Sequence, residues 1–487
     1  MSPRATIRCC LPLACLLVAG VAGARTWTVG PSGRDYTQLS TLFDANDIAP
    51  GDLVEVDGNA TYNSAKMGED DGGAPGNPVV VRWKRVAGAT RPVLSGGIHT
   101  FKFERADHVV FEGFEVRGGS STCVFSEADD IVVRDAVIHA CPSHGILGAD
   151  QNSGSFTLEY SELYDSGAGA TKHTIYMQSD EIAYPGATFT MRFNYVHNGN
   201  GGNLLKVRHA RSFIHSNWFE GAFYQEIELI GPDCETQQAG WTRATKREDS
   251  ELLNNVIVHT SSWPNAIRAG GDLNGASDGR VRMVGNTILF DRAGSANAVY
   301  VQLGLGSLEM HDNAIFQTGG AAPAIARAIS TPDTPFCAPF VTTPWSGARS
   351  VAGSRNWVQA TATFNLVGRH DLPVLVALAH MTSYSNNGNW GTSQLTANDQ
   401  VRFWSHLNSL LPDRFRIYGR HLLRSIVPFQ TWGGAPVSRS RGFLTLFKSG
   451  WLPRDNGWVV HQGLRVERGS CRLGIAVLTG RQPSMAS

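Results

Sequence analysis

Charged side chains gather in the middle of the chain, each one residue after an apolar residue that would face a core. The apolar residues are Ile146, Ile175, Leu205, Ile227, Ile267 and Val299, and the residues that follow them are Leu147, Tyr176, Lys206, Glu228, Arg268 and Tyr300. Two residues further on, a second column reads Ala149, Gln178, Arg208, Ile230, Gly270 and Gln302. Because strand side chains alternate between faces, both columns are predicted to face solvent, with Glu226 beside Glu228.

This set of side chains suits an acidic polysaccharide as substrate. Lys206, Arg208 and Arg268 are the candidate catalytic residues, because cations neutralise a uronate carboxylate and a nearby basic group moves the protons of a β-elimination. Tyr176, Tyr300 and Gln178 are the candidate substrate-binding residues, with the two tyrosine rings as platforms for sugars. The sequence therefore predicts a polysaccharide lyase.

Other interpretations of the same residues remain open. A glycoside hydrolase needs paired carboxylates, which Glu226 with Glu228, or Glu228 with Asp233, would supply. A non-catalytic glycan-binding or surface protein would need only an exposed ladder of charge-paired cross-strand neighbours. His173 is a weaker candidate base, for which an exposed polar histidine is the simpler interpretation.

A recurring pattern indicates how these segments stack. Apolar strands end in a polar residue, often Asn, then any residue, then an apolar one, in copies that begin at residues 114, 136, 161, 194, 217, 255, 286 and 313, with a ninth at 356. The smallest spacings are 22 and 23 residues, and a unit of that size buries its apolar face only by stacking on neighbours. We expect an all-β protein, a right-handed parallel β-helix from about residue 52 to 356 with an N-terminal cap.

Stacking also assigns roles to the asparagines and cysteines. The recurring residues are expected to form a structural ladder of stacked amides: Asn194, Asn217, Asn255, Asn286 and Asn313. Cys123 and Cys141, 18 residues apart on adjacent coils, are predicted to form a disulfide. Cys234 and Cys337 are a second candidate pair.

Four stretches resemble pectate-lyase-like β-helix proteins, and within them the alginate lyase and chondroitinase B family of polysaccharide lyases. They are Asp35-Tyr36-Thr37, Pro50-Gly51-Asp52, Leu94-Ser95-Gly96-Gly97 and Val109-Val110-Phe111-Glu112-Gly113-Phe114, and the resemblance covers residues 27 to 320. Residues 225 to 230 resemble the family's Gly-Glu-x-Glu-Ile-Ile segment, which implies Glu226 and Glu228 as ligands of a Ca²⁺ cofactor. Gly231-Pro232-Asp233-Cys234 stands where the family has its Lys base, and this departure leaves Lys206 as the replacement.

The two ends of the chain differ from the repeats. Arg4 and Arg8, an apolar run from 11 to 22 and the small residues 22 to 24 predict a signal peptide over residues 1–24, cleaved after Ala24. We therefore expect a secreted or periplasmic monomer without a membrane span. The remaining 40 basic and 42 acidic residues give no sign of nucleic-acid binding.

Residues 25–365 are expected to form the β-helix domain. Residues 366–487 hold 14 basic against 5 acidic residues. We expect an irregular, poorly ordered basic segment there, with a small basic domain that holds an anionic polymer as the alternative.

Overall fold

The structure is a computed structural model. It describes residues 23–231, 248–271, 277, 279–302, 305–319, 322–328, 350–358, 363–366 and 374–376, parts of 401–424, and residues 433–454 and 457–482. The predicted signal peptide and the Cys234–Cys337 pair lie wholly or almost wholly outside these residues. Neither of the two α-helices whose bounds are given below is long and apolar enough to cross a bilayer.

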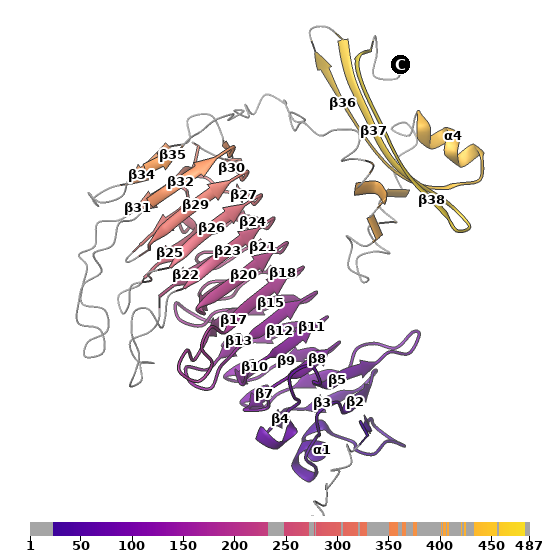
Figure 1. Ribbon diagram of the computed structural model, residues 1–487, viewed down its shortest axis with the longest axis vertical. Helices are drawn as coiled ribbons and strands as arrows, with labels where there is room; N and C mark the ends of the chain where they lie inside the picture. The colour runs from indigo at the N-terminus through magenta and orange to yellow at the C-terminus, as the bar shows by residue number, and fades with distance from the viewer. Residues whose placement is uncertain are drawn as a thin grey trace, which may run out of the picture.

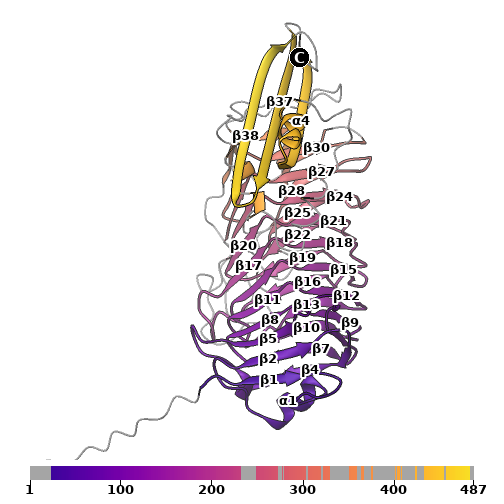
Figure 2. The same cartoon turned by 90° about the vertical axis from the view of Figure 1, so that its right-hand side faces the viewer.

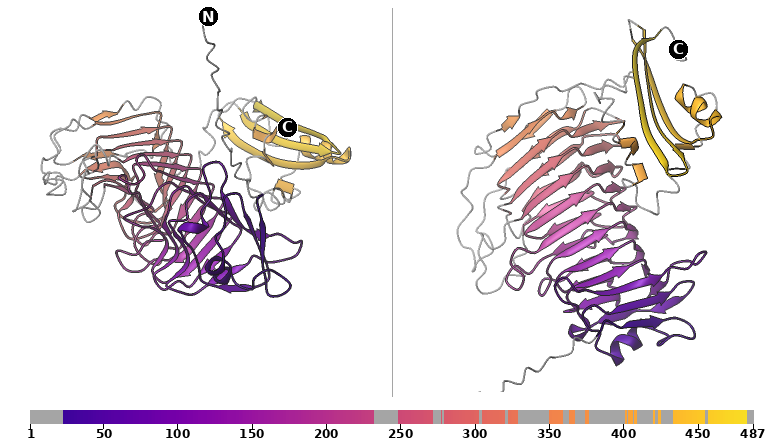
Figure 3. Two further views of the ribbon diagram at one scale, coloured as in Figure 1. Left: turned by 60° about the horizontal axis from the view of Figure 1, so that its bottom comes forward. Right: turned by 45° about the vertical axis from the view of Figure 1, so that its right-hand side comes forward.

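Three parallel sheets run along the body of the molecule, and the coils between its two ends each contribute one strand to each sheet (Figures 1 and 3). Sheet A has β1 (Thr26–Val29), β2 (Leu53–Asp57), β5 (Val79–Lys84), β8 (Val109–Glu112), β11 (Ile131–Arg134), β14 (Phe156–Glu159), β17 (Thr188–Arg192), β20 (Arg211–His215), β23 (Asp249–Leu253), β26 (Arg280–Val284), β29 (Ser307–His311), β32 (Ser350–Ser354) and β35 (Val374–Val376). Sheet B has β3 (Thr61–Asn63), β6 (Val93–Ser95), β9 (Glu115–Arg117), β12 (Val137–Cys141), β15 (Glu162–Ser166), β18 (Tyr195–His197), β21 (Trp218–Glu220), β24 (Val256–His259), β27 (Thr287–Phe290), β30 (Ala314–Gln317) and β33 (Trp357–Val358). Sheet C has β4 (Ala65–Met67), β7 (His99–Glu104), β10 (Thr122–Glu127), β13 (His144–Gly148), β16 (Ile175–Gln178), β19 (Leu205–Arg208), β22 (Ile227–Ile230), β25 (Asn265–Gly270), β28 (Asn297–Val301), β31 (Ala324–Ala328) and β34 (Thr363–Leu366).

This arrangement is a right-handed parallel β-helix, as the repeat predicted. Its core follows from alternation along each short strand. In β11, Ile131 and Val133 are buried, while Val132 and Arg134 face outward and are half-buried. The sheets extend further than expected, because β1 already pairs with β2 and β35 still pairs with β32.

A cap closes the N-terminal end of the coils. Helix α1 (Leu39–Ala45) buries Leu39, Leu42 and Phe43, and the 3₁₀ turn η1 (Glu69–Asp71) follows β4. Phe43 meets Phe101 of the core edge-on, with ring centroids 6.4 Å apart. The cap therefore covers apolar side chains that the first coils would otherwise expose.

The asparagine ladder occupies the corner between sheets A and B. Each Asn after Asn194 accepts, through its side-chain oxygen, the backbone N–H and the side-chain N–H of the Asn one coil earlier, at 2.9–3.1 Å. The members are Asn194, Asn217, Asn255, Asn286, Asn313 and Asn356. The expectation of a structural ladder is confirmed, and Ser161 begins the column by accepting from the backbone N–H of Ala136.

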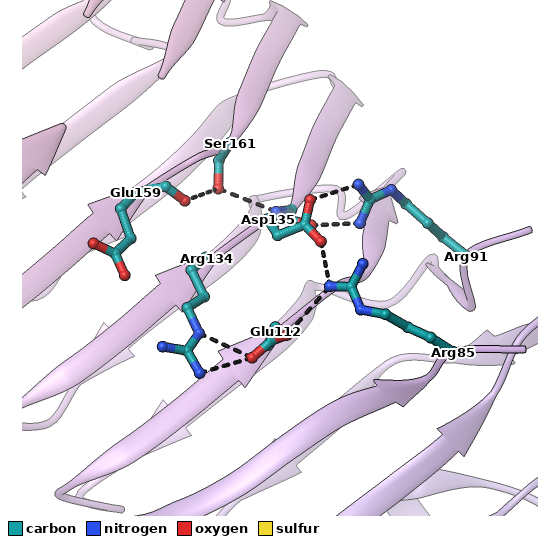
Figure 4. Close-up of polar contacts among 8 residues, drawn as sticks. Arg85, Arg91, Glu112, Arg134, Asp135, Glu159 and Ser161 are labelled. Carbon is teal, nitrogen blue, oxygen red and sulfur yellow. Dashed lines mark hydrogen bonds and ion pairs between the residues drawn. The ribbon is translucent and has the colours of Figure 1, made fainter. Parts of the chain in front are cut away.

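A charged network holds the loop after β5 against this corner (Figure 4). Arg91 donates to the side chain of Asp135 at 2.7 Å and to its carbonyl at 2.5 Å, and Arg85 joins Asp135 to Glu112. Burial alone would raise the pKa of Asp135, but the hydrogen bonds from the two arginines outweigh it and lower the pKa. Because Asp135 has the left-handed φ of 50° at the corner, the network also restrains the turn itself.

The predicted disulfide is present between Cys123 and Cys141, with Cα atoms 5.8 Å apart. The C-terminal segment differs from expectation. Helix α4 (Gly434–Ser440) precedes three long antiparallel strands, β36 (Leu444–Arg454), β37 (Gly457–Arg468) and β38 (Cys471–Gln482). Residues 433–454 and 457–482 hold a helix and three regular strands where the charge imbalance predicted an irregular segment, and Val460, Leu464 and Val466 lie on one buried face of β37.

Candidate functional site

The predicted outward column is present on sheet C, in the predicted register. Cross-strand pairing runs through Leu147, Tyr176, Lys206, Glu228, Arg268 and Tyr300. It continues to Arg327 on β31. We call the five residues from Tyr176 to Tyr300 the sheet C column; their strands, β16 to β28, lie side by side in Figure 2.

Glu228 lies at the centre of this column and is buried, whereas the two cations beside it are partly exposed. One oxygen of Glu228 accepts from Arg268 Nη1 at 2.5 Å. The other accepts from the side-chain N–H of Asn203 at 2.6 Å and lies 3.9 Å from Lys206 Nζ. The carboxylate therefore contacts both cations, whose side chains are 15% and 23% exposed.

Tyr176 and Lys206 form a contact across neighbouring strands. The Nζ atom of Lys206 lies 4.9 Å from the centre of the Tyr176 ring, in cation–π geometry. At the other end of the column, Arg268 Nε donates to the side chain of Gln302, one strand further on. Tyr300 is half-exposed there, next to Arg327.

Four residues of the second column are buried, contrary to expectation: Gln178, Arg208, Ile230 and Gly270; only Ala149 and Gln302 are partly exposed. Gln178 is buried and donates to Asp150 at 2.5 Å. Arg208 is only 1% exposed; its Nε donates to the phenol oxygen of Tyr176 at 3.0 Å and its Nη1 to the carbonyl of Gly231. Gln178 and Arg208 end their strands, β16 and β19, at the turn that leads to sheet A. Arg208 can therefore act on a ligand only through Tyr176, and Gln178 does not reach the surface.

Glu226 and Glu228 do not form the expected pair. Strand β22 begins at Ile227, so alternation does not extend to Glu226. Its oxygen lies 2.7 Å from Nδ1 of His259, and both side chains are 0% exposed. These residues do not fit a Ca²⁺ site, because the carboxylate of Glu226 is paired with His259 and that of Glu228 with Lys206 and Arg268. Among the described residues, no cluster of three or more His, Cys, Asp or Glu is suited to a metal.

Two histidines that sequence reasoning undervalued lie at the base of the sheet C column. His144 Nδ1 accepts the backbone N–H of His173, and His173 Nδ1 accepts that of Asn203, at 3.1 and 2.9 Å. The ring of His173 meets Tyr176 edge-on at 5.4 Å. Both histidines are buried rather than exposed. The missed signal is a polar residue two positions before each inward residue, which recurs at 144, 173, 203, 225, 265 and 297.

Burial keeps these histidines neutral. Desolvation, with Lys172 and Lys206 adding positive charge, lowers the pKa of His144 to about 4. Desolvation and Lys206 lower the pKa of His173 well below its ordinary 6.5. Because each Nδ1 accepts a backbone N–H, the neutral rings carry their proton on Nε2. In that form they orient the strand starts and cannot serve as bases through Nδ1.

The local charge of the site is positive. Lys206 and Arg208 on β19 and Arg268 on β25 lie on the two strands beside β22, which carries the buried carboxylate of Glu228. Such an excess attracts an anionic group to the outer side of the column, and the partly exposed tyrosine rings at its two ends offer apolar contact surfaces. The geometry can bind and polarise a carboxylate next to groups that transfer protons.

No protein-family model and no curated protein matches the chain. Among solved structures, an alginate lyase from Paenibacillus sp. str. FPU-7 is similar at 15% identity and a TM-score of 0.42, covering 72% of this chain and 99% of that one. The pectate lyase Pel9A is 12% identical, with a TM-score of 0.41 and 82% and 88% coverage. The A-module of the mannuronan C-5 epimerase AlgE6 of Azotobacter vinelandii is 14% identical, with a TM-score of 0.40 and 70% and 95% coverage. The fold of this chain is established by its own parallel sheets.

Proposed function

We propose that the protein is an exported enzyme that cleaves an acidic, uronate-containing polysaccharide by β-elimination on the outward face of sheet C. The observation that carries the proposal is the sheet C column, in which two partly exposed cations lie on either side of one buried carboxylate. A neutral glycan would not need this excess of positive charge, whereas a uronate carboxylate is neutralised by it.

Each side chain has a role that its surroundings support. Arg268, held by Glu228 at 2.5 Å, neutralises the uronate carboxylate. Tyr176, whose phenol oxygen accepts from Arg208 at 3.0 Å, removes the C5 proton. Lys206, whose Nζ lies 3.9 Å from Glu228, protonates the leaving oxygen. The C5–H and C4–O bonds break, a C4=C5 double bond forms, and no oxidant or water is consumed.

A screen of acidic polysaccharides tests this proposal directly. Ultraviolet absorbance reports the unsaturated product of an elimination, and Tyr176→Phe is expected to abolish it. Products with saturated ends would show hydrolysis instead, and binding without any product would show a glycan-binding protein. Since Glu226 and Glu228 are held by His259 and Arg268, a chelator is expected to leave turnover unchanged.

A further inference from the structure

An exposed aromatic cluster lies on the turns that lead into the sheet C column. We call Phe223, Tyr224 and Trp263 the aromatic corner. Tyr224 meets Phe223 and Trp263 edge-on, with centroids 4.8 and 5.0 Å apart, and Phe223 and Trp263 are 48% and 42% exposed. The two turns enter β22 and β25, the strands that carry Glu228 and Arg268.

Hydrogen bonds from beneath join these two turns to each other. His259 Nδ1 contacts Glu226 at 2.7 Å, and its Nε2 contacts the carbonyl of Trp263 at 2.6 Å. Ser261 donates its hydroxyl to the carbonyl of Tyr224 and accepts the backbone N–H of Trp263, at 3.1 and 3.0 Å. The backbone that carries the exposed indole is therefore bound from two sides.

Apolar side chains could fill the space that the buried pair of Glu226 and His259 occupies in the core. One coil further on, Phe290 pairs in register with His259 and is itself fully buried, so an apolar residue can pack at this level of the helix. Replacing a buried ion pair by apolar residues is often neutral or stabilising. Unlike Phe290, the pair of Glu226 and His259 also holds the turn of Trp263 in a fixed position.

We propose that the aromatic corner is a second sugar-binding subsite, in which a ring of the polysaccharide stacks against Trp263 and Tyr224 while a neighbouring sugar occupies the sheet C column. The inference rests on the proposed function for its ligand. Aromatic rings with polar edges suit the apolar faces of sugars. Tyr224 and Trp263 precede Glu228 and Arg268 by four and five residues, at most roughly 17 Å of chain. Glu226 and His259 are positioning residues.

Trp263→Ala tests the subsite. The KM of this variant for the polymer is expected to rise about tenfold or more, because tryptophans that become buried on binding often contribute much of the binding energy. Its kcat is expected to stay near that of the native enzyme. On the shortest oligosaccharide that is cleaved, which cannot span both places, the variant and the native enzyme should agree. Trp218→Ala is the matched control, because Trp218 is 46% exposed on the outward face of sheet B. Equal KM values for Trp263→Ala and the native enzyme, or an equal loss in the control, would overturn the subsite.

A role of Glu226 and His259 in positioning the turn is tested by a split between KM and kcat, because a purely structural role would not change KM alone. Glu226→Ala should raise KM for the polymer with kcat preserved, and Glu226→Gln, which keeps a hydrogen-bonding oxygen facing His259, should recover most of the loss. A fall of kcat on substrates of every length would instead assign the pair a role in folding alone.

Calorimetric binding of the same polysaccharides separates the two proposals. If the native protein binds a glycan but cleaves none, elimination is wrong, and the aromatic corner is judged by whether Trp263→Ala weakens that binding about tenfold. If cleavage is present and Trp263→Ala binds as the native protein does, the corner alone is wrong. If no acidic glycan binds, the assignment of a sugar to the corner is wrong as well.

Discussion

The asparagine ladder and the sheet C column both place one residue per coil along the axis of the β-helix, and they treat their polar groups in opposite ways. In the ladder, identical amides bond to one another from Asn194 to Asn356 and are buried. In the column, unlike residues follow one another, and the cations Lys206 and Arg268 keep partly exposed sides. Repetition of one residue type pairs identical amides with one another, whereas the unlike residues of the column place two partly exposed cations beside one buried carboxylate.

The largest effect is expected when a cation of the sheet C column is removed. Lys206→Ala and Arg268→Ala should each lower turnover of the cleaved polysaccharide by about 10²- to 10⁴-fold, because they remove a proton donor and the partner of the uronate carboxylate. Product absorbance under initial-rate conditions measures this, and circular dichroism checks the fold. Undiminished turnover in both variants would move the active site away from sheet C.

The next effect breaks the ladder. Asn255→Ala removes the acceptor of two N–H groups of Asn217 and the donor to the carbonyl of Ile214. Unsatisfied buried groups cost about 1–3 kcal/mol each, so the free energy of unfolding should fall by about that amount or more in a denaturant titration. Turnover per folded molecule should not change. Asn200→Ala, at an exposed asparagine outside the ladder, is the control that should unfold like the native protein.

A smaller effect concerns the histidines at the base of the column. In the folded state the pKa of His144 is lowered to about 4 from its ordinary value of 6.5, so the ring stays neutral down to about pH 4. The unfolded chain takes up the proton first, so stability is complete above about pH 6.5 and is lost as the pH falls toward 4. His144→Asn with His173→Asn, which copies the residue of later coils such as Asn203, should flatten this slope. An unchanged slope of melting temperature against pH would remove both histidines as its cause.

The smallest effect is expected for an exposed ion pair outside the sheet C column. Arg282 and Glu251 form an exposed ion pair at 3.2 Å on the outward face of sheet A. Such pairs contribute about 1 kcal/mol or less, so Arg282→Ala should change neither turnover nor the melting temperature appreciably. A marked loss of turnover would indicate that an outward charged ladder on sheet A also binds substrate.

Much of the fold was predictable because a parallel coil repeats its constraints. The minimal spacing of 22 to 23 residues, the ladder and the Cys123–Cys141 bridge all follow from residues returning to the same corner. The register of the sheet C column followed from the inward residues, since a slip by one would expose the whole core face. The C-terminal strands were not predicted, because the basic charge of residues 366–487 suggested an irregular segment although Val460, Leu464 and Val466 alternate.

Within the strands of the β-helix, the sequence alone determined which residues share a face, because alternation and stacking act within each strand. The tertiary structure decided which of those residues a ligand can reach. Arg208 is covered because it ends a strand, Glu226 is buried with His259 because it precedes one, and Trp263 is exposed because its turn is held from beneath. Turns obey no period of two, so their side chains take directions that only the packing of neighbouring coils sets.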